Sequence, residues 1–361
     1  MDTIVQPDQD TEGAHGMIRS RPRRAVLAFG LPILWLVLVT TWELTCPMAT
    51  DDALTVRIAL CAAFLVAVVS LCASVRLGPV RELKQAREVA HATQQALLRP
   101  LPARLDGLAV AAGQLSASPG ATVGGDLYEA LSTVHGVRIV IGDVRGHGLP
   151  ALGAVAAVLG SFREAAHDEP ELAGVMRRLE RALERHLRER SRDEHPSAGG
   201  ADPENPLAEE FVTVLLIEIG AAGELLAVNC GHPWPYRLRG SAGPLSDADP
   251  LPPLGPFPLP AAIPLQRCGR LLPGDALVLH TDGAADARDS GGRFFPLEEV
   301  LATAALNSPV SPADVIDRVH RSLLRHTGGR LCDDVALLVL RNDRSRVPAQ
   351  PGAVQAVRAR H

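Results

Sequence analysis

Lysine is almost absent from this sequence: Lys84 is the single one, and arginine supplies the rest of the 36 basic residues. Aromatic residues are also scarce, at 3% of the chain, although hydrophobic residues of all kinds reach 47%. Any core must therefore be built from Ala, Val and Leu. There is no basic excess either, since 41 acidic residues outnumber the 36 basic ones. Because a nucleic-acid partner usually requires a basic face, the composition speaks against one.

The cysteines give no sign of a metal or redox motif. No two of the six form a C-x-x-C pair, the spacing that is typical of zinc sites and thioredoxin-type motifs. We therefore expect free, reduced thiols in a cytosolic domain. The six are Cys46, Cys61, Cys72, Cys230, Cys268 and Cys332.

The longest apolar runs lie in the N-terminal third, at residues 25–44 and 53–75. Each has the length of about 20 residues that is needed to cross a membrane. Arginines precede the first run and follow the second, and two aspartates lie between them, so the positive-inside rule puts both ends in the cytoplasm. We expect two transmembrane helices in the cell membrane, after a disordered cytoplasmic stretch at residues 1–24. A cleaved signal peptide would explain only the first run, and a buried hairpin of a soluble fold is the other alternative.

Residues 78–102 are predicted to form a linker helix, which Pro100 and Pro102 end. Three apolar residues in it recur every seven positions, a spacing that suits a parallel coiled coil and therefore a homodimer. A solvated spacer lying on the next domain fits the pattern equally well. The three residues are Leu83, Ala90 and Leu97.

From about Leu105 the sequence changes to short alternating runs that are typical of β-strands. Tight turns at His135-Gly136 and Ala222-Gly223 indicate hairpins. Strands are expected within LAVAAGQLSA (108–117), VRIVIGD (137–143), FVTVLLIEIG (211–220) and ELLAVNCG (224–231). Antiparallel hairpins with separate helices predict an α+β sandwich over residues 103–342, followed by a disordered tail at 343–361.

Helical patterns and loop-like segments alternate in the same region. Helices are expected at about 149–166, 170–190, 296–306 and 311–326. The segments 191–209 and 241–260 are rich in proline or in polar residues and are expected to be loops. Arginines and glutamates alternate along 170–190, which predicts a salt-bridged, solvated helix face.

Four predicted strand ends carry aspartates next to glycine or to a second aspartate. Each alone is typical of a turn or cap, but strand ends can bring distant residues to one edge of a sheet. A carboxylate cluster stays ionised only if a cation cancels its charge, and oxygen ligands without a His or Cys pattern favour Mg²⁺ or Mn²⁺. Two such ions can activate water and clamp a phosphoryl group. The aspartates are Asp126, Asp143, Asp282 and the pair Asp333-Asp334.

Seven motifs follow one another within residues 85–342. They are GGDLYEA (124–130), IGDVRGHGLPA (141–151), EFVTVLL (210–216), NCGHPWPYRL (229–238), PPLG (252–255), LLPGDALVLHTDGAADARD (271–289) and CDDVALLVL (332–340). In this order they resemble the bacterial PP2C-type protein serine/threonine phosphatases of the SpoIIE/RsbU class. The resemblance implies two packed antiparallel sheets flanked by helices, with metals at one end of the sandwich.

By position, the resemblance implies a set of ligands for two Mn²⁺ or Mg²⁺ ions. Asp143 would bridge the ions and, with Asp126, hold the bridging water. The backbone carbonyl of Val144 would bind the second ion, and Asp334 is the less favoured member of its pair. The implied ligands are Asp126, Asp143, Val144, Asp282 and Asp333.

Several other residues in these motifs leave alternatives open. Glu129 stands where members of the class commonly have Asp, which puts in doubt any outer-shell role at that position. Arg145 could contact the substrate phosphate or be a solvated loop arginine. His147 could act as a general acid or form local hydrogen bonds at a helix start. His232 is expected to be structural.

The apolar runs and the resemblance together predict a membrane-anchored, metal-dependent phosphatase with a cytoplasmic catalytic domain. Water activated by the metals would attack phosphoserine or phosphothreonine phosphorus directly, without a covalent enzyme intermediate. Members of the class often act on phosphorylated anti-sigma-factor antagonists, so the expected partner is a phosphorylated regulatory protein. The alternative is a non-catalytic PP2C-like signalling module tethered to the membrane. The spans and linker helix could also act as a switch that depends on a dimer interface.

Overall fold

The computed structural model describes most of the C-terminal three quarters of the chain. The chain divides into two units, Met1–Ala86 and Arg87–His361, and the fold described below belongs to the second. The described residues are 97–116, 124–146, 149–194, 210–306 and 309–344, together with Thr41, Ala62, Ala63 and Val66.

Several expectations from the sequence lie outside these residues. Among the described residues, no helix has the length and apolar character needed to cross a membrane. Of the predicted linker helix only the end is described, where Leu97 is helical and the residues that follow it are not. Outside the described residues lie the stretch 1–24, nearly all of the predicted spans 25–44 and 53–75, the linker before Leu97, His147 and the tail after Arg344.

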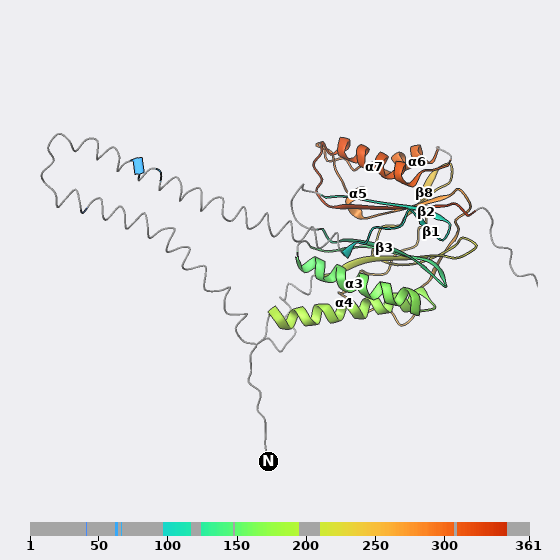
Figure 1. Ribbon diagram of the computed structural model, residues 1–361, viewed down its shortest axis with the longest axis horizontal. Coiled ribbons are helices and arrows are strands. Elements are labelled where there is room, and N and C mark those ends of the chain that lie inside the picture. Colours follow the sequence, from blue (N-terminus) through green and yellow to red (C-terminus); the bar gives the residue numbers. More distant parts are fainter. Residues whose placement is uncertain are drawn as a thin grey trace, which may run out of the picture. The chain divides into compact units, whose positions relative to one another are not determined.

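Two antiparallel sheets form the centre of the domain (Figure 1). The six-stranded sheet has the order β1-β2-β11-β10-β7-β8, and the five-stranded sheet has the order β3-β4-β5-β6-β9. The strands of the first are β1 (Arg104–Leu105), β2 (Leu108–Leu115), β7 (Tyr236–Leu238), β8 (Ala242–Pro244), β10 (Ala276–His280) and β11 (Val335–Asn342). Those of the second are β3 (Asp126–Thr133), β4 (Gly136–Val144), β5 (Val212–Ile219), β6 (Glu224–Cys230) and β9 (Gln266–Arg270).

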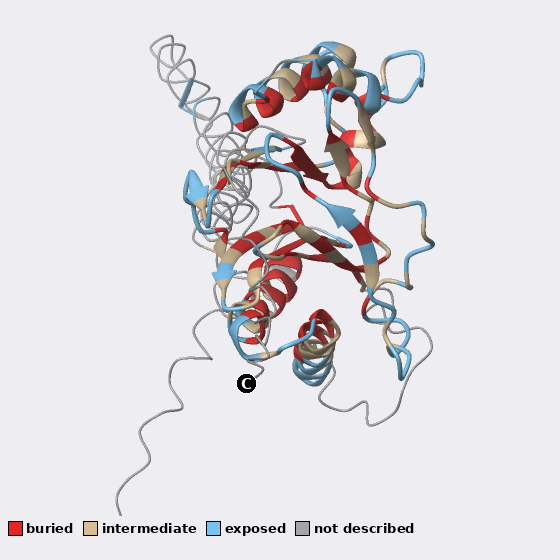
Figure 2. Ribbon diagram, turned by 90° about the vertical axis from the view of Figure 1, so that its right-hand side faces the viewer, coloured by how far each residue is buried: buried red, intermediate tan, exposed pale blue. Residues whose placement is uncertain are grey.

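Helices cover the outer face of each sheet, so that the domain has four layers (Figure 1). Helices α3 (Leu149–Asp168) and α4 (Leu172–Glu194) pack on the five-stranded sheet, and α6 (Leu297–Ala305) and α7 (Pro312–His326) pack on the six-stranded one. A short helix, α5 (Asp282–Ala285), follows β10. Figure 2 shows the buried residues concentrated between these layers.

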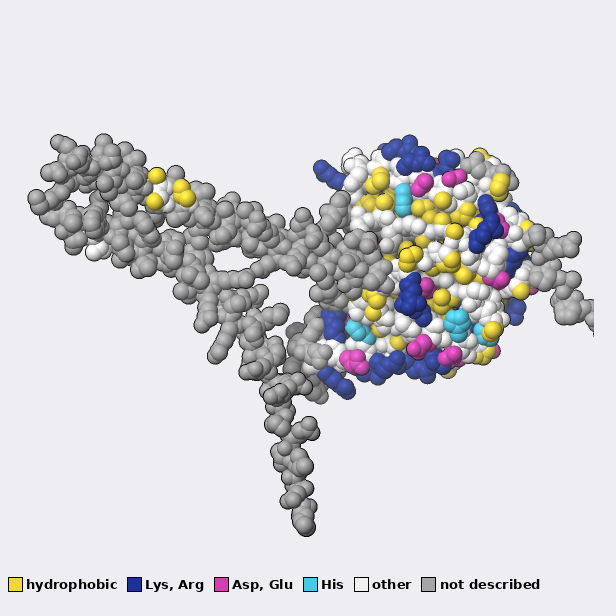
Figure 3. All heavy atoms as spheres, viewed as in Figure 1, with side chains coloured by type: hydrophobic (Ala, Val, Ile, Leu, Met, Phe, Trp, Pro, Cys, Tyr) yellow, Lys and Arg dark blue, Asp and Glu magenta, His cyan; other side chains and the backbone are white. Residues whose placement is uncertain are grey.

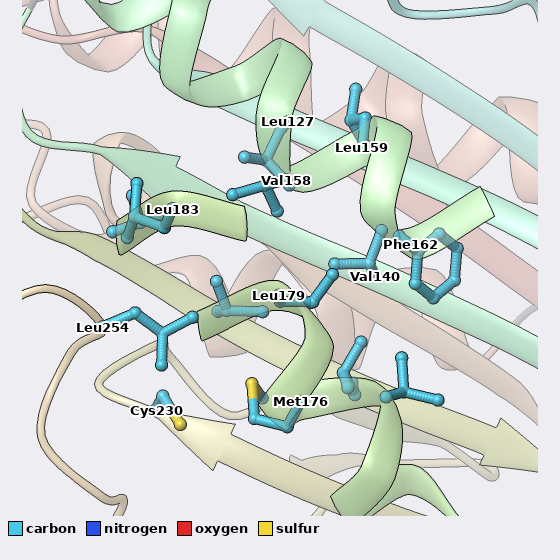
Figure 4. Packing of buried hydrophobic residues seen from close by; sticks show 14 of the residues in the cluster. Leu127, Val140, Val158, Leu159, Phe162, Met176, Leu179, Leu183, Cys230 and Leu254 are labelled. Atoms are coloured by element: carbon cyan, nitrogen blue, oxygen red, sulfur yellow. The ribbon is translucent and has the colours of Figure 1, made fainter. Parts of the chain in front are cut away.

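Strand β4 shows why the sheets lie at the centre of the stack, since all but its first residue and Asp143 are buried. Val137, Ile139 and Ile141 belong to the apolar cluster between the two sheets. The alternate residues Val140 and Val144 belong to the cluster beneath α3 and α4. Successive side chains of a strand point to opposite faces, so a continuous apolar run fits a strand covered on both sides. Figure 4 shows Val140 among Val158, Leu159 and Phe162 of α3 and Leu179 of α4.

A buried arginine fastens β4 to the turn between α3 and α4. The side chain of Arg138 is fully buried and forms an ion pair with Glu218 of β5, at 2.7 Å. Its guanidinium also donates hydrogen bonds to three backbone carbonyls, those of Ala166, Glu169 and Pro170. A buried charge needs such complete pairing, so this cluster fixes where the helix pair sits on the sheet.

The sequence predicted most of these elements to within a few residues. The four long helices and the strand pairs around His135-Gly136 and Ala222-Gly223 are confirmed. Gly136 and Gly223 have the positive φ angles that such turns require, at 119° and 83°. Three expectations were wrong in detail. The segment 241–260 contains the short strand β8, and α4 continues to Glu194, into the segment 191–209 that was expected to be a loop. Asp282 begins α5 rather than closing a strand.

The charged face of α4 is solvated only in part. Arg188 pairs with Glu184 one turn away, at 2.6 Å, as the alternating pattern predicted. Other charged residues of this face bind the proline-rich segment 241–260. Glu180 accepts a hydrogen bond from the Leu259 amide, and Arg177 donates one to the Pro260 carbonyl. Figure 3 shows basic and acidic side chains intermingled along the edge of the domain where α4 runs.

Candidate active site

Two of the predicted acids face each other across a hairpin. Asp126 opens β3 and is the direct cross-strand partner of Asp143, near the end of β4. The amide of Val144 donates a hydrogen bond of 3.1 Å to the carbonyl of Gly125, which closes the adjacent pair of the ladder. Directly opposed residues of an antiparallel pair project from the same face of the sheet, with their Cβ atoms about 5 Å apart. The two carboxylates are therefore neighbours although 17 positions separate them.

The other acids come from the six-stranded sheet. Strands β10 and β11 pair antiparallel, and His280, the last residue of β10, is opposite Leu337. The end of β10 and the start of β11 therefore lie together, with Asp282 following the one and Asp333 and Asp334 preceding the other. The backbone there is so tight that a Cβ on Gly283 would lie 2.0 Å from the Asp334 carbonyl oxygen.

The charges of the acids from the two sheets act on one another. Burial raises the pKa of Asp126 well above its usual range, and the charges of Asp143 and Asp334 raise it further. The pKa of Asp143 is raised to about 7, first by burial and then by Asp282, Asp333 and Asp334. Burial followed by the charge of Asp333 also raises the pKa of Asp282. Like charges that raise one another's pKa in this way need a cation if all are to remain ionised.

Glycines reserve space beside the oxygen atoms of this cluster. A Cβ added to Gly125 would lie 2.1 Å from the carbonyl oxygen of Val144 and 2.8 Å from Asp143 Oδ1. A Cβ on Gly124 would lie 1.8 Å from Asp334 Oδ2. The Gly-Gly pair of the first motif therefore lets backbone and carboxylate oxygens approach where a side chain would exclude them.

The donor set fits hard divalent cations. Its atoms are carboxylate oxygens and the backbone carbonyl oxygen of Val144, and oxygen atoms are the ligands that Mg²⁺ and Mn²⁺ prefer. Within the described ranges, no three acidic, histidine or cysteine side chains are arranged closely enough to hold one ion as they stand. The chain thus brings the predicted ligands to the same end of the sandwich without closing them around a common point.

Glu129 lies on the opposite face of β3 from Asp126. Its side chain is buried and accepts hydrogen bonds from the guanidinium of Arg163 on α3, at 2.8 and 2.6 Å. On that face, Leu127 belongs to the cluster beneath α3 and α4, and Leu131 packs against the same cluster. The carboxylate of Glu129 therefore binds Arg163 of α3 and does not face the aspartates, which argues against an outer-shell role for it at the metal site.

Of the two residues that the sequence proposed for substrate binding, the structure describes Arg145 but not His147. The amide of Arg145 donates to the carbonyl of Phe211 at 2.9 Å, and its guanidinium carbon lies 5.2 Å from the centre of the Phe211 ring. The side chain is exposed, so the structure leaves both of its predicted roles open. His147 lies outside the described residues.

Three polar residues beside the aspartates complete the site, and the sequence pointed to only one of them. His232, predicted to be structural, is buried and lies 3.0 Å from the hydroxyl of Thr213 and 3.1 Å from the carbonyl oxygen of His280. Thr281 is fully buried and donates a hydrogen bond of 3.3 Å to Asp126 Oδ2. The threonines were missed because threonine is common in strands for its β-branched shape alone. Their places inside the EFVTVLL and HTDG segments were the available signal.

Comparison with known proteins places this arrangement in a family. Residues 133–343 match the family described as Stage II sporulation protein E (SpoIIE). Among solved structures, the fold is similar to the SiaA-PP2C domain of Pseudomonas aeruginosa, with a TM-score of 0.55 and 17% identity, covering 74% of this chain and 98% of that one.

Two other solved structures share the fold over a smaller part of their own length. The RsbU and RsbW domains of Rv1364c from Mycobacterium tuberculosis match with a TM-score of 0.50 and 23% identity, over 68% of this chain and 61% of that chain. The PP2C phosphatase domain of SpoIIE from Bacillus subtilis, with a fragment of its regulatory domain, matches with a TM-score of 0.50 and 15% identity, over 65% and 63% of the two chains.

The family match covers β4 to β11 and therefore three of the four strand ends that carry the aspartates. The fourth, Asp126, joins them as the direct partner of Asp143. Because the family match covers more than half of the chain, the chain belongs to the SpoIIE family.

Proposed function

We propose that the protein is a phosphatase that removes phosphate from phosphoserine or phosphothreonine of a regulatory protein, with two Mn²⁺ or Mg²⁺ ions held by its aspartates. The observation that carries the proposal is the pairing of Asp126 with Asp143 beside Gly125, at the end of the sandwich where Asp282 and Asp333 also lie. The three atoms nearest to a Cβ built on Gly125 are the carbonyl oxygen of Val144, Asp143 Oδ1 and the Val144 amide nitrogen, so two proposed ligand atoms closely approach this glycine.

Asp143 is the acid best placed to be shared between two ions. It is opposite Asp126 on the neighbouring strand, and its pKa is raised by Asp282 and Asp333 of the other sheet. The carbonyl oxygen of Val144 lies on the same side of the turn, against Gly125. Asp126 would serve one ion, while Asp282, Asp333 and the Val144 carbonyl would complete the set.

The chain's own residues define what the site can do. Bound divalent ions would supply charge neutralisation for the phosphoryl group and activation of a water molecule. The aspartates would orient that water toward phosphorus, in a reaction in which water supplies one oxygen and the bond from phosphorus to the serine or threonine oxygen breaks. The products are inorganic phosphate and the free hydroxyl, so no covalent enzyme intermediate is needed.

The substrate and the location of the enzyme belong to the same proposal. The SpoIIE/RsbU resemblance favours a phosphorylated anti-sigma-factor antagonist, and one structural relative combines an RsbU with an RsbW domain. The apolar runs at 25–44 and 53–75 would tether the phosphatase to the cytoplasmic face of the cell membrane. Fractionation of cells that express the full chain, or a chain without residues 25–75, tests the tether: the first should sediment with membranes and the second should not.

Hydrolysis by the purified full-length chain tests the enzyme. In detergent and Mn²⁺, the wild type should hydrolyse an aryl phosphate and a phosphoserine protein, and Asp143→Asn should reduce both rates by more than about a hundredfold. Asp249→Asn is the matched control, since this exposed aspartate lies in a loop. Equal, negligible rates for wild type and Asp143→Asn, with no Mn²⁺ bound, would instead favour the non-catalytic signalling module.

A further inference from the structure

A single buried hydroxyl joins the two sheets beside the aspartates. Thr281 lies between β10 and Asp282, and none of its surface is exposed. Its hydroxyl oxygen accepts a hydrogen bond of 2.9 Å from the amide of Ala336 on β11 and donates one of 3.3 Å to Asp126 Oδ2 on β3. Its own amide donates to the Ala336 carbonyl at 3.1 Å. Thr281 therefore ties β10 and β11 of one sheet to the first aspartate of the other.

A second link crosses the sandwich through His232. The amide of Asp143 donates to Thr213 Oγ1 at 3.2 Å, and that oxygen lies 3.0 Å from His232 Nδ1. His232 Nε2 lies 3.1 Å from the carbonyl oxygen of His280. A carbonyl only accepts, so in a neutral ring Nε2 carries the proton and Nδ1 accepts from the Thr213 hydroxyl. The chain of bonds runs from Asp143 on β4 to the end of β10, two residues before Asp282.

The neighbouring backbone holds His232 in this orientation. The side chain of Asn229 accepts a hydrogen bond of 2.9 Å from the His232 amide and donates one of 2.8 Å to its carbonyl. Gly231 between them has a φ of 71°, a conformation that favours glycine. Burial lowers the pKa of His232 to about 3, so the ring is neutral, as the direction of its hydrogen bonds requires. The Asn-Cys-Gly-His segment thus forms a rigid bracket for one imidazole.

We infer that Thr281 and the pair Thr213–His232 are positioning residues, which set the spacing between the aspartates of the two sheets. The inference rests on the proposed metal-dependent function. Apolar side chains fill the space between the sheets, and apolar packing is not directional. Metal ligands must meet their ion to within about 0.2 Å, so directional bonds at the edge are needed to hold the acids of two separate sheets in register.

Substitutions that remove only the hydroxyl test this role. Thr281→Val and Thr213→Val keep the shape of the side chain, whereas Thr281→Ser and Thr213→Ser keep the hydroxyl. Titration calorimetry with Mn²⁺ on the full-length chain should show dissociation constants raised about 10- to 100-fold in the valine variants, the usual cost of losing an outer-shell partner. The serine variants should bind Mn²⁺ nearly as the wild type does.

Thr133→Val is the matched control for a loss of stability alone. Thr133 lies at the far end of β3 from Asp126, and its hydroxyl also accepts and donates, from the His135 amide and to the Gly136 carbonyl. This variant should lower the melting temperature of the metal-free chain without changing its affinity for Mn²⁺. The same comparison shows whether any loss of affinity in Thr281→Val merely follows its stability.

The hydrogen-bonded pair of Thr213 and His232 can also be tested with a double variant. Thr213 and His232 act in series, so combining Thr213→Val with His232→Gln should weaken Mn²⁺ binding no more than the stronger single change. Wild-type affinity in both valine variants would overturn the inference while leaving the metal centre in place. A wild-type chain that binds no Mn²⁺ would overturn the metal centre, and the inference with it.

Discussion

Asp126 and Asp143 are direct cross-strand partners on β3 and β4, so two carboxylates share one face of the sheet. Burial raises the pKa of Asp143 to about 7, with the charges of Asp282, Asp333 and Asp334 adding to it, and the charge of Asp143 in turn raises the pKa of Asp126. Asp143→Asn should therefore abolish Mn²⁺-dependent hydrolysis and yet raise the melting temperature of the metal-free chain at pH 8. Calorimetry in EDTA measures the second effect, with Asp249→Asn as the control. A lower melting temperature for Asp143→Asn alone would contradict the repulsion argument.

Metal removal should expose the same repulsion in the wild type. An ion that binds only the folded state stabilises it by about 2.7 kcal/mol at a concentration of 100 times its dissociation constant. For a domain of this size, that corresponds to a rise of about 5–10 °C in melting temperature. Thermal unfolding with saturating Mn²⁺ and then with excess EDTA should show the rise and its reversal. The rise should be absent in Asp143→Asn, and a rise of equal size there would show that the ion binds elsewhere.

Gly125 should be intolerant of even a methyl group. A Cβ there would lie 2.1 Å from the carbonyl oxygen of Val144 and 2.8 Å from Asp143 Oδ1, so Gly125→Ala must displace two proposed ligands. We expect a folded chain that has lost most of its Mn²⁺ affinity and activity, measured by titration calorimetry and phosphate release.

The control for this change is Gly160→Ala in α3. A Cβ at Gly160 meets no other atom within 4 Å, and alanine is the better helix former, so this variant should gain about 0.5–1 kcal/mol in stability. Full activity in Gly125→Ala would show that the close approach of Val144 and Asp143 to Gly125 is not part of the site.

Local sequence patterns predicted the aspartates of the site better than they predicted the hydrogen bonds that surround them. Asp126 and Asp143 could be found because each lies beside glycine at the end of a predicted strand. The hydrogen bond from Thr281 to Asp126 joins residues 155 positions apart, and the Arg163 partner of Glu129 lies 34 positions away on a helix. Such contacts depend on how sheets and helices are stacked, which strand periodicity does not encode. Asp282 was predicted to close a strand, but β10 ends at His280 and α5 begins at Asp282, so the error was one of two residues in the position of the strand end.

Removing the buried charge of Arg138 should destabilise the domain more than any surface ion pair. Its guanidinium is fully buried and serves Glu218 and three backbone carbonyls. Arg138→Met leaves those groups without their partner, and breaking a buried pair in this way costs about 3–5 kcal/mol.

Urea unfolding provides the measurement for this change. Arg188→Met serves as the control, because the pair of Arg188 with Glu184 is largely exposed and should be worth less than about 1 kcal/mol. Losses of equal size in the two variants would mean that the Arg138 cluster does not fasten the helices to the sheet.

His232 should make the stability of the domain depend on pH in one direction. Burial lowers the pKa of His232 to about 3 in the folded chain, whereas an unfolded histidine has a pKa of about 6.5. Between these values the unfolded state binds the extra proton, so the contribution of His232 to stability is complete above pH 6.5 and is lost as the pH falls. The slope approaches about 1.4 kcal/mol per pH unit.

The aspartates of the site titrate as well, and their raised pKa values oppose this trend, because protonation relieves their repulsion in the folded state. The difference between wild type and His232→Gln isolates the histidine, since glutamine does not titrate. Urea unfolding in EDTA at several pH values from 8 to 5 should give curves that run parallel above pH 7. Below about pH 6 the wild type should lose stability faster than His232→Gln. Parallel curves over the whole pH range would show that His232 takes up a proton as readily in the folded chain as in the unfolded one. The imidazole would then not be held in the neutral form that bridges Thr213 and His280.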